Sequence, residues 1–231
     1  MKYPRIIAHR CGGRLARENS LAGLSATASI GCHGVEFDTM LSADGVPVLM
    51  HDLTVDRTTD GHGKVADLTA KELRQMKLGS EAVPLLAEAL ARCAELGLWA
   101  NVELKPPAGG EALLGRVVGQ FLAANWNGHG VVSSFSDLAS LEARQAAPSL
   151  DYALLVEALP DDWLDRARRL GAVAVHANAA RLTDADRTAV HAAGLTLACY
   201  TVNRRADAEL LLASGVAVFT DRPDLWQAGE M

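Results

Sequence analysis

The sequence predicts an α/β protein in which strands and helices alternate along the whole chain. Three observations support this prediction. Short apolar runs are followed repeatedly by a polar loop and an amphipathic helix that ends at glycine. Most of the apolar runs are continuous, as in parallel strands buried on both faces. The length of 231 residues is close to the roughly 250 that are typical of a (β/α)8 barrel. We therefore expect a TIM (β/α)8 barrel with an extra antiparallel hairpin strand.

Nine apolar runs are predicted to be strands. They cover residues 5–9, 35–41, 46–51, 98–105, 130–135, 152–156, 172–176, 196–201 and 216–220. The second and third runs are too close for a helical crossover, so they must be antiparallel. Their connection contains Asp44-Gly45, which favours a two-residue type I′ turn. Eight barrel strands and one return strand then account for all nine runs.

Capping residues and glycines mark the predicted helices. Ser, Thr, Pro or Asn stands at each marked start, and Gly stands at each end. The start and end pairs are Ser20 and Gly31, Thr69 and Gly79, Pro84 and Gly97, Thr183 and Gly194, and Asn203 and Gly215. Glu72 and Asp186 follow the two threonines by three residues, as in a capping box.

The chain is expected to form one domain over residues 1–231, because no linker or low-complexity segment divides it. The competing α/β architecture is an open doubly wound sheet, whose usual marker is a Gly-rich phosphate loop after the first strand. Here that position holds His9-Arg10-Cys11-Gly12-Gly13, which does not match G-x-G-x-x-G. This difference favours the barrel.

Composition and charge exclude several classes of protein. The net charge is −6 and no basic stripe is visible, which argues against a nucleic acid as the main partner. A small anionic substrate stays open, because a metal or a few local cations can reverse the field inside one pocket. The four cysteines are far apart and form no C-x-x-C pair, so we expect reduced thiols. With no signal peptide and no run of roughly 18 apolar residues, we expect a cytoplasmic protein without membrane insertion.

Ionisable residues gather at the ends of the predicted strands, where a barrel carries its active site. The segments are His9-Arg10, Glu36-x-Asp38, His51-Asp52 and Glu103-x-Lys105. Residues two apart on a strand face the same way, so Glu36 and Asp38 share a face, as do Glu103 and Lys105. Three carboxylates on neighbouring strands would repel one another unless a cation lay between them, and oxygen ligands favour Mg²⁺ or Ca²⁺, with Mn²⁺ as an alternative. The plain alternative is a set of surface carboxylates paired with Arg10 and Lys105.

The hairpin predicts where one histidine lies. In a two-residue turn Ala43 pairs with Val46, which places Asp38 opposite His51 on the same face. A register shift of one residue would direct His51 elsewhere.

Two of the seven histidines stand at strand ends beside carboxylates, and we expect these two, His9 and His51, to be catalytic. His176 ends a strand and is a candidate for the pocket lining, while the role of His62 stays open. His33, His129 and His191 lie on predicted helices or loops and are taken as ordinary surface or packing residues. Arg10 and Lys105 add two cations at the same rim, which suits a phosphoryl group; Lys105 has the alternative of pairing only with Glu103.

The segments that carry these residues resemble the glycerophosphodiester phosphodiesterases, and look most like the short cytosolic bacterial type. They occur in family order and span nearly the whole chain. They are Ala8-His9-Arg10, Arg17-Glu18-Asn19-Ser20, Val35-Glu36-Phe37-Asp38, Asp44-Gly45-Val46-Pro47-Val48, His51-Asp52, Asp56-Arg57-Thr58-Thr59-Asp60-Gly61, Val102-Glu103-Leu104-Lys105, Ser134-Phe135, Thr201-Val202-Asn203 and Thr220-Asp221-Arg222-Pro223.

The resemblance implies a TIM barrel with a short insertion at residues 53–80. It implies one divalent cation held by Glu36, Asp38 and Glu103, an acid–base pair of His9 and His51, and phosphate contacts from Arg10 and Lys105. Glu18 and Asn19 match a motif that borders the site, and Phe135, His176 and Tyr200 are further candidates for the pocket. The implied reaction is hydrolysis of a small glycerophosphodiester to glycerol 3-phosphate and an alcohol, through attack by the glycerol 2-hydroxyl.

The chain departs from the family pattern at four positions. Cys11 replaces the usual Gly after His-Arg, Arg17 replaces Pro, Ser20 replaces Thr and Tyr200 replaces Trp. No catalytic group is lost, so these departures concern substrate preference more than activity. The sequence predicts neither the preferred head group nor the oligomeric state.

Two other functions are weighed against this one. A phospholipase-D-like enzyme for lysophospholipids or sphingolipids would favour a signal peptide, disulfides or an exposed apolar lip, and the sequence displays none of these. A non-catalytic metal- or phosphate-binding barrel would be expected to have lost a histidine or a carboxylate. Here all are retained.

Overall fold

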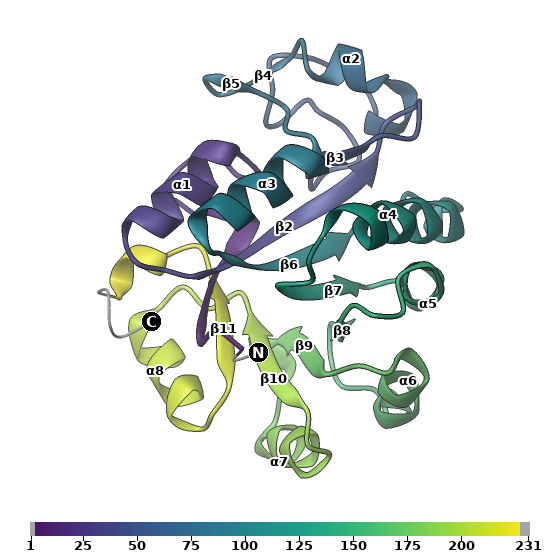
Figure 1. The fold of residues 1–231 in the computed structure, drawn as a ribbon. Coiled ribbons are helices and arrows are strands. Elements are labelled where there is room, and N and C mark those ends of the chain that lie inside the picture. The colour runs from purple at the N-terminus through teal and green to yellow at the C-terminus, as the bar shows by residue number, and fades with distance from the viewer. Residues whose placement is uncertain (1–2, 227–231) are drawn as a thin grey trace.

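Eight parallel strands close into a ring in the computed structural model, which describes residues 3–226 (Figure 1). β1 pairs with both β2 and β11, and this double pairing closes the barrel. Around the ring the strands are β1 (Ile6–Ala8), β2 (Gly34–Leu41), β6 (Trp99–Leu104), β7 (Gly130–Ser134), β8 (Tyr152–Val156), β9 (Ala174–Asn178), β10 (Thr196–Tyr200) and β11 (Ala217–Thr220). The predicted TIM barrel is confirmed.

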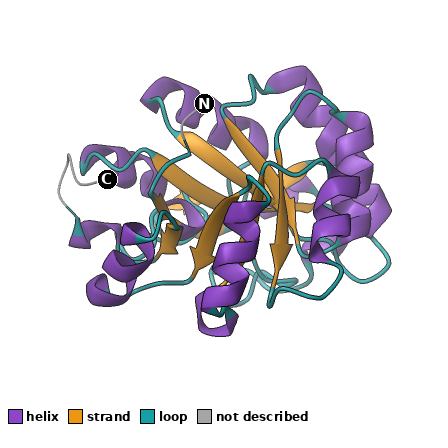
Figure 2. Ribbon diagram, turned by 90° about the horizontal axis from the view of Figure 1, so that it is seen from below, coloured by secondary structure: helices purple, strands orange, loops and turns teal. Residues whose placement is uncertain are grey.

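Helices surround the strands, as Figure 2 shows from another side. They are α1 (Leu21–Ser29), α3 (Leu86–Leu96), α4 (Glu111–Asn125), α5 (Asp137–Ala146), α6 (Trp163–Leu170), α7 (Asp184–Ala192) and α8 (Arg205–Ala213). Strand residues alternate between a core inside the ring, which includes Ile7 and Val131, and a core under the helices, which includes Ile6 and Val132. Each fully buried Val or Leu contributes about 1.5–3 kcal/mol. Burial on both faces explains why the strands are continuously apolar.

Most of the predicted caps are present. Ser20 Oγ accepts a hydrogen bond from the Gly23 amide at 3.0 Å, and both Thr69 and Thr183 form capping boxes. Gly97 ends α3 in the left-handed conformation, with φ 65°.

Three details of the predicted helices are wrong. The helix after Thr69 is only α2 (Ala70–Leu73), because the chain then turns into a hairpin of β4 (Lys77–Leu78) and β5 (Glu81–Ala82), where Gly79 serves the turn. Pro84 precedes the N-cap of α3 instead of lying in its first turn. Asn203 does not cap α8, because its side chain is engaged by Asp221.

The hairpin of β2 with β3 (Pro47–Leu49) differs by one residue from the predicted register. Thr39 pairs with Leu49. The Gly45 amide bonds to Ser42 O at 2.9 Å and Gly45 has φ 77°, so the loop has three residues and ends in a bulge. Asp38 therefore lies opposite Met50, whose amide donates to Asp38 O at 3.1 Å, and not opposite His51.

Residues 53–80 pack beside β2 and β3, at the top of Figure 1. They contain a short 3-10 helix (Val65–Asp67), α2, and the β4 strand. A separate apolar cluster joins this segment to the hairpin: Met40, Val48, Met50, Val55, Val65, Leu73, Leu78 and Val83. The segment thus extends one side of the barrel, and the apolar cluster that it shares with the hairpin holds it there.

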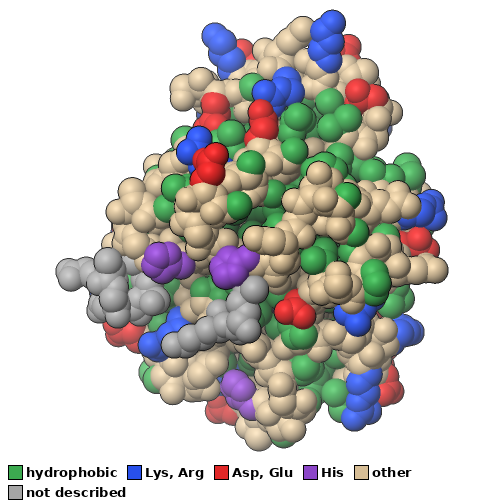
Figure 3. Space-filling model, viewed as in Figure 1, with side chains coloured by type: hydrophobic (Ala, Val, Ile, Leu, Met, Phe, Trp, Pro, Cys, Tyr) green, Lys and Arg blue, Asp and Glu red, His purple; other side chains and the backbone are tan. Residues whose placement is uncertain are grey.

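Three further features concern the surface charges, the cysteines and the helices. On the face that Figure 3 shows, acidic and basic side chains are interspersed. Cys11, Cys32, Cys93 and Cys199 are buried free thiols. None of the helices within residues 3–226 has both the length and the apolar character needed to cross a membrane.

Candidate active site

A cavity of about 170 Å³ opens at the carboxyl ends of the barrel strands. Ten of the residues that line it are candidate site residues predicted from the sequence, and four are not. The first group is His9, Arg10, Glu36, Asp38, His51, Glu103, Lys105, Phe135, His176 and Tyr200. The other four are Asn101, Leu155, Thr201 and Phe219.

Glu36, Asp38 and Glu103 form a compact acidic cluster. One ligand atom from each lies within 4.8 Å of the others. Strand pairing produces this cluster, because Asp38 on β2 is in register with Glu103 on β6 and parallel partners share a face. Burial, followed by repulsion from Asp38, raises the pKa of Glu36 to about 8 and that of Glu103 to about 7. Glu36 Oε1 is buried and has no hydrogen-bond partner. A hard cation with oxygen ligands fits this cluster.

The carboxylates are held by neighbouring groups. Asn19 Nδ2 donates to Asp38 Oδ2 at 2.9 Å, and the Asp38 amide donates to Asn19 Oδ1 at 3.0 Å. The Arg10 amide donates to Glu36 Oε2 at 2.8 Å. Asn19 and Arg10 both have positive φ, 55° and 51°, a backbone conformation that non-glycine residues rarely adopt. This local backbone directs the backbone amide of Arg10 and the side-chain amide of Asn19 toward the acidic cluster.

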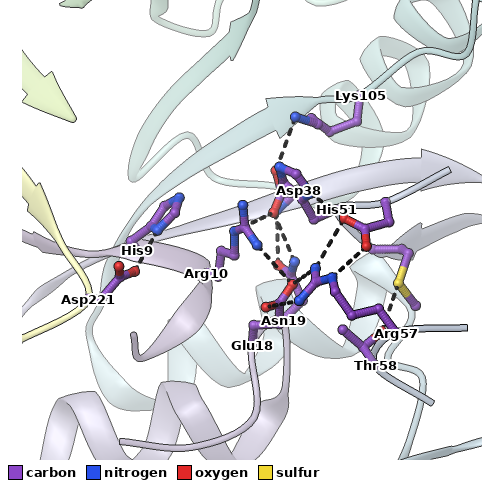
Figure 4. A network of polar contacts seen from close by, with 12 residues as sticks. His9, Arg10, Glu18, Asn19, Asp38, His51, Arg57, Thr58, Lys105 and Asp221 are labelled. Atoms are coloured by element: carbon purple, nitrogen blue, oxygen red, sulfur yellow. Dashed lines mark hydrogen bonds and ion pairs between the residues drawn. The ribbon is translucent and has the colours of Figure 1, made fainter. Parts of the chain in front are cut away.

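His9 is oriented by Asp221 (Figure 4). Its Nδ1 lies 2.7 Å from Asp221 Oδ1, and its Nε2 lies 3.9 Å from Glu36 Oε2. An ionised carboxylate can only accept, so the proton is on Nδ1 and Nε2 faces the acidic cluster. Burial opposes the charged imidazole, but the bond to Asp221 and the charge of Glu36 outweigh it and raise the pKa of His9.

His51 has an equivalent partner in Asp52. Its Nδ1 lies 2.7 Å from Asp52 Oδ1. The side chain lines the cavity even though the hairpin register differs from the predicted one, because β3 ends at Leu49 and the chain bends at His51. In both histidines Nδ1 is therefore bonded to an aspartate, and Nε2 is the ring nitrogen that this aspartate does not engage.

Two cations flank the acidic cluster. Arg10 Nε lies 3.8 Å from Asp38 Oδ2, and Arg10 Nη1 donates to Glu18 Oε1 at 3.0 Å. Lys105 Nζ lies 3.3 Å from Glu103 Oε1 and 3.9 Å from Asp38 Oδ1. Lys105 thus forms the ion pair with Glu103 that is its alternative predicted role, and it also lines the cavity.

Aromatic side chains form part of the cavity wall. Phe135 is 47% exposed and meets the Tyr200 ring edge-on, with centroids 5.9 Å apart. Lys105 Nζ lies 5.9 Å from the Phe135 centroid. The Tyr200 hydroxyl donates to Val156 O at 2.8 Å. Tyr200 thus lines the cavity with its hydroxyl already hydrogen-bonded to the backbone.

His176 lies deep in the cavity wall. It is buried, and its Nε2 is hydrogen-bonded to the hydroxyl of Tyr3. Burial lowers the pKa of His176 to about 3, so this ring is neutral near pH 7. Glu18 and Asn19 do not line the cavity and contact it through Arg10 and Asp38.

Sequence reasoning did not assign a role to four residues that the structure brings to this site. Asp221 and Asp52 orient the histidines, Arg57 binds Asp52 and Glu18, and buried Asn101 lines the cavity with its Oδ1 unpartnered. Asp52 adjoins His51, and Asp221 directly follows the last strand, so position at a strand end was the signal for both. Arg57 lies in the insertion, far from any strand end.

The chain matches the glycerophosphoryl diester phosphodiesterase family over residues 9–225. A glycerophosphodiester phosphodiesterase of Caldanaerobacter subterraneus subsp. tengcongensis is 29% identical over 95% of this chain and 94% of that protein. Human glycerophosphodiester phosphodiesterase 1 is 45% identical over a shorter stretch, 38% of this chain and 29% of that protein.

A solved structure is similar over the whole barrel. It is an Oleispira antarctica phosphodiesterase in complex with the product sn-glycerol-3-phosphate, with 32% identity and a TM-score of 0.91 over 96% of this chain and 94% of that one. Fold, site composition and these similarities agree. This chain belongs to the glycerophosphoryl diester phosphodiesterase family.

Proposed function

We propose that this protein hydrolyses glycerophosphodiesters to glycerol 3-phosphate and an alcohol, with a divalent cation at Glu36, Asp38 and Glu103 and with His9 and His51 as the acid–base pair. The main supporting observation is one cavity that holds three close carboxylates and two histidines, each with a carboxylate at Nδ1. The Oleispira antarctica relative was solved with sn-glycerol-3-phosphate, the product proposed here.

The acidic cluster supports a cation with oxygen ligands, Mg²⁺, Ca²⁺ or Mn²⁺. A bound ion of this kind polarises phosphoryl oxygens and offsets their negative charge. Arg10 and Lys105 add positive charge on either side of Asp38. The planar guanidinium suits two phosphate oxygens at once, whereas the ammonium acts as a point charge.

The two histidines divide the proton transfers. Each keeps its proton on Nδ1 through its carboxylate, which leaves Nε2 to accept or donate. One Nε2 takes the proton of the glycerol 2-hydroxyl as its oxygen bonds to phosphorus. The bond from phosphorus to the alcohol breaks, and the other histidine protonates the departing oxygen. A water then opens the cyclic phosphate with the two roles exchanged, which restores both histidines and yields glycerol 3-phosphate.

The same proposal includes a location and a kind of substrate. We place the protein in the cytoplasm with a small diffusible substrate. Four buried free thiols and the small cavity are the supporting observations.

The test is release of glycerol 3-phosphate from glycerophosphocholine by the purified protein, with EDTA or with added Mg²⁺ or Ca²⁺. We expect metal-dependent release that His51→Ala abolishes and that His191→Ala, on the exposed side of α7, leaves unchanged. No release with any ion or glycerophosphodiester would overturn the function, and lysophospholipids would be assayed next. Equal rates on diesters that lack glycerol would overturn attack by the 2-hydroxyl.

A further inference from the structure

Arg57 lies between the carboxylates of Asp52 and Glu18, next to the proposed active-site cavity (Figure 4). Its Nε donates to Asp52 Oδ2 at 2.6 Å and its Nη1 donates to Glu18 Oε2 at 2.8 Å. Its Nη2 is shared, at 3.0 Å from Asp52 Oδ1 and 2.6 Å from Glu18 Oε1. One guanidinium therefore joins both oxygens of two carboxylates that come from different segments of the chain.

Each of these carboxylates holds one group of the cavity. Asp52 Oδ1 bonds to His51 Nδ1 at 2.7 Å, and Glu18 Oε1 accepts from Arg10 Nη1 at 3.0 Å. Arg57 itself does not line the cavity. It is two contacts away from a histidine on one side and from a phosphate-binding cation on the other.

We propose that Arg57 is a positioning residue that fixes His51 through Asp52 and Arg10 through Glu18. The inference rests on the proposed function, since it assigns a role to Arg57 in that reaction. In this proposal the insertion at residues 53–80 supplies the guanidinium of Arg57 to the site.

The backbone around Arg57 is anchored well enough for this role. Val55 and Thr58 are buried on either side of it. Thr58 Oγ1 donates to Met50 Sδ at 3.4 Å, and the Thr59 amide donates to Val55 O at 3.0 Å. The turn is thus held against the hairpin that carries His51.

Stability alone does not explain the arrangement. The Arg57 side chain is 49% exposed, and ion pairs at that exposure contribute little to the free energy of unfolding. Four hydrogen bonds from one planar group instead fix the direction of both carboxylates, which a lysine cannot do. Groups that orient a functional side chain typically change activity by about 10- to 100-fold when removed.

The experiment compares Arg57→Ala with Arg74→Ala, since Arg74 is another partly exposed arginine of the same insertion, paired with Glu88 away from the cavity. We expect Arg57→Ala to lower kcat/KM about 10- to 100-fold with a nearly unchanged Tm. Arg74→Ala should match wild type. Guanidinium at low concentration should partly restore Arg57→Ala, while an equal concentration of sodium chloride should not. Arg57→Lys should remain impaired.

Variants of Asp52 and Glu18 test separately the connection from Arg57 to His51 and the connection from Arg57 to Arg10. Asp52→Asn should act mainly on kcat, because it loosens His51, and Glu18→Gln should act mainly on KM, because it loosens Arg10. If Arg57→Ala folds poorly, Arg57→Lys decides the question, because it keeps the positive charge and loses the planar group that bonds to both carboxylates. Wild-type rates for Arg57→Ala, or Asp52→Asn and Glu18→Gln both at wild-type values, would overturn the inference. Failure of the proposed function is distinguishable, because wild type would then be inactive.

Discussion

His9 Nδ1 lies 2.7 Å from Asp221 Oδ1, although the two residues are 212 positions apart in the chain. They follow β1 and β11, the strands whose pairing closes the ring. The pairing of β1 with β11 that closes the barrel therefore also brings His9 next to Asp221. Asp221 is in turn held by Asn203, whose Nδ2 donates to Asp221 Oδ2 at 2.7 Å.

Asp221→Asn should lower kcat about 10- to 100-fold with little change in KM. The neutral amide no longer holds the proton on His9 Nδ1, so Nε2 becomes a poorer base. Steady-state kinetics on glycerophosphocholine check this. Asp224→Asn is the control, because Asp224 is partly exposed and pairs with Arg222 outside the cavity. Equal kcat for Asp221→Asn and wild type would rule out the orienting role.

Binding of a divalent cation should raise the Tm of the metal-free protein. Ligand at 100 times its Kd adds about 2.7 kcal/mol to the free energy of unfolding, which corresponds to roughly 5–10 °C for a chain of this size. Glu36→Gln and Glu103→Gln should lose the shift. Glu142→Gln, which removes a carboxylate paired with Arg116 on the surface, should keep it. Thermal scans with Mg²⁺, Ca²⁺ and Mn²⁺ measure it, and an identical shift in Glu36→Gln would exclude the cluster as the metal site.

Phe135→Ala should raise KM for glycerophosphocholine by about 10-fold, which corresponds to the 1.4 kcal/mol expected from loss of one aromatic contact. The ring is half exposed at the cavity and contacts Tyr200 edge-on. Leu138→Ala is the matched control, because Leu138 is 49% exposed and does not line the cavity. A KM that stays at the wild-type value in Phe135→Ala would show that the ring does not contact substrate.

The four thiols should resist modification in the native protein. All are buried, and burial raises the pKa of Cys32 to about 11 and those of Cys93 and Cys199 to about 12, so the reactive thiolate is scarce. A chromogenic thiol reagent near pH 8 should report four thiols only after denaturation. Rapid reaction of even one thiol in the native protein would contradict the buried positions.

The sequence by itself determined the strand and helix alternation, and hence the barrel. Spacing along one strand also put Glu36 and Asp38 on a shared face, because side chains repeat every two residues whatever the partner strand does. The same local reasoning placed Lys105 next to Glu103. Caps at Thr69 and Thr183 were equally local, since each involves a residue only three positions away.

Only the tertiary structure decided how distant segments meet. The hairpin register depended on Ser42 and Gly45 forming a bulged three-residue loop, a difference of one residue that composition does not specify. Asn203 bonds to Asp221 instead of capping a helix, because barrel closure brings the two together. Arg57 reaches Glu18 from 39 positions away. Periodicity indicates which face of a strand a residue occupies. Contacts between distant elements depend on packing of the whole ring, and so the pairing of His9 with Asp221 appears only in the folded chain.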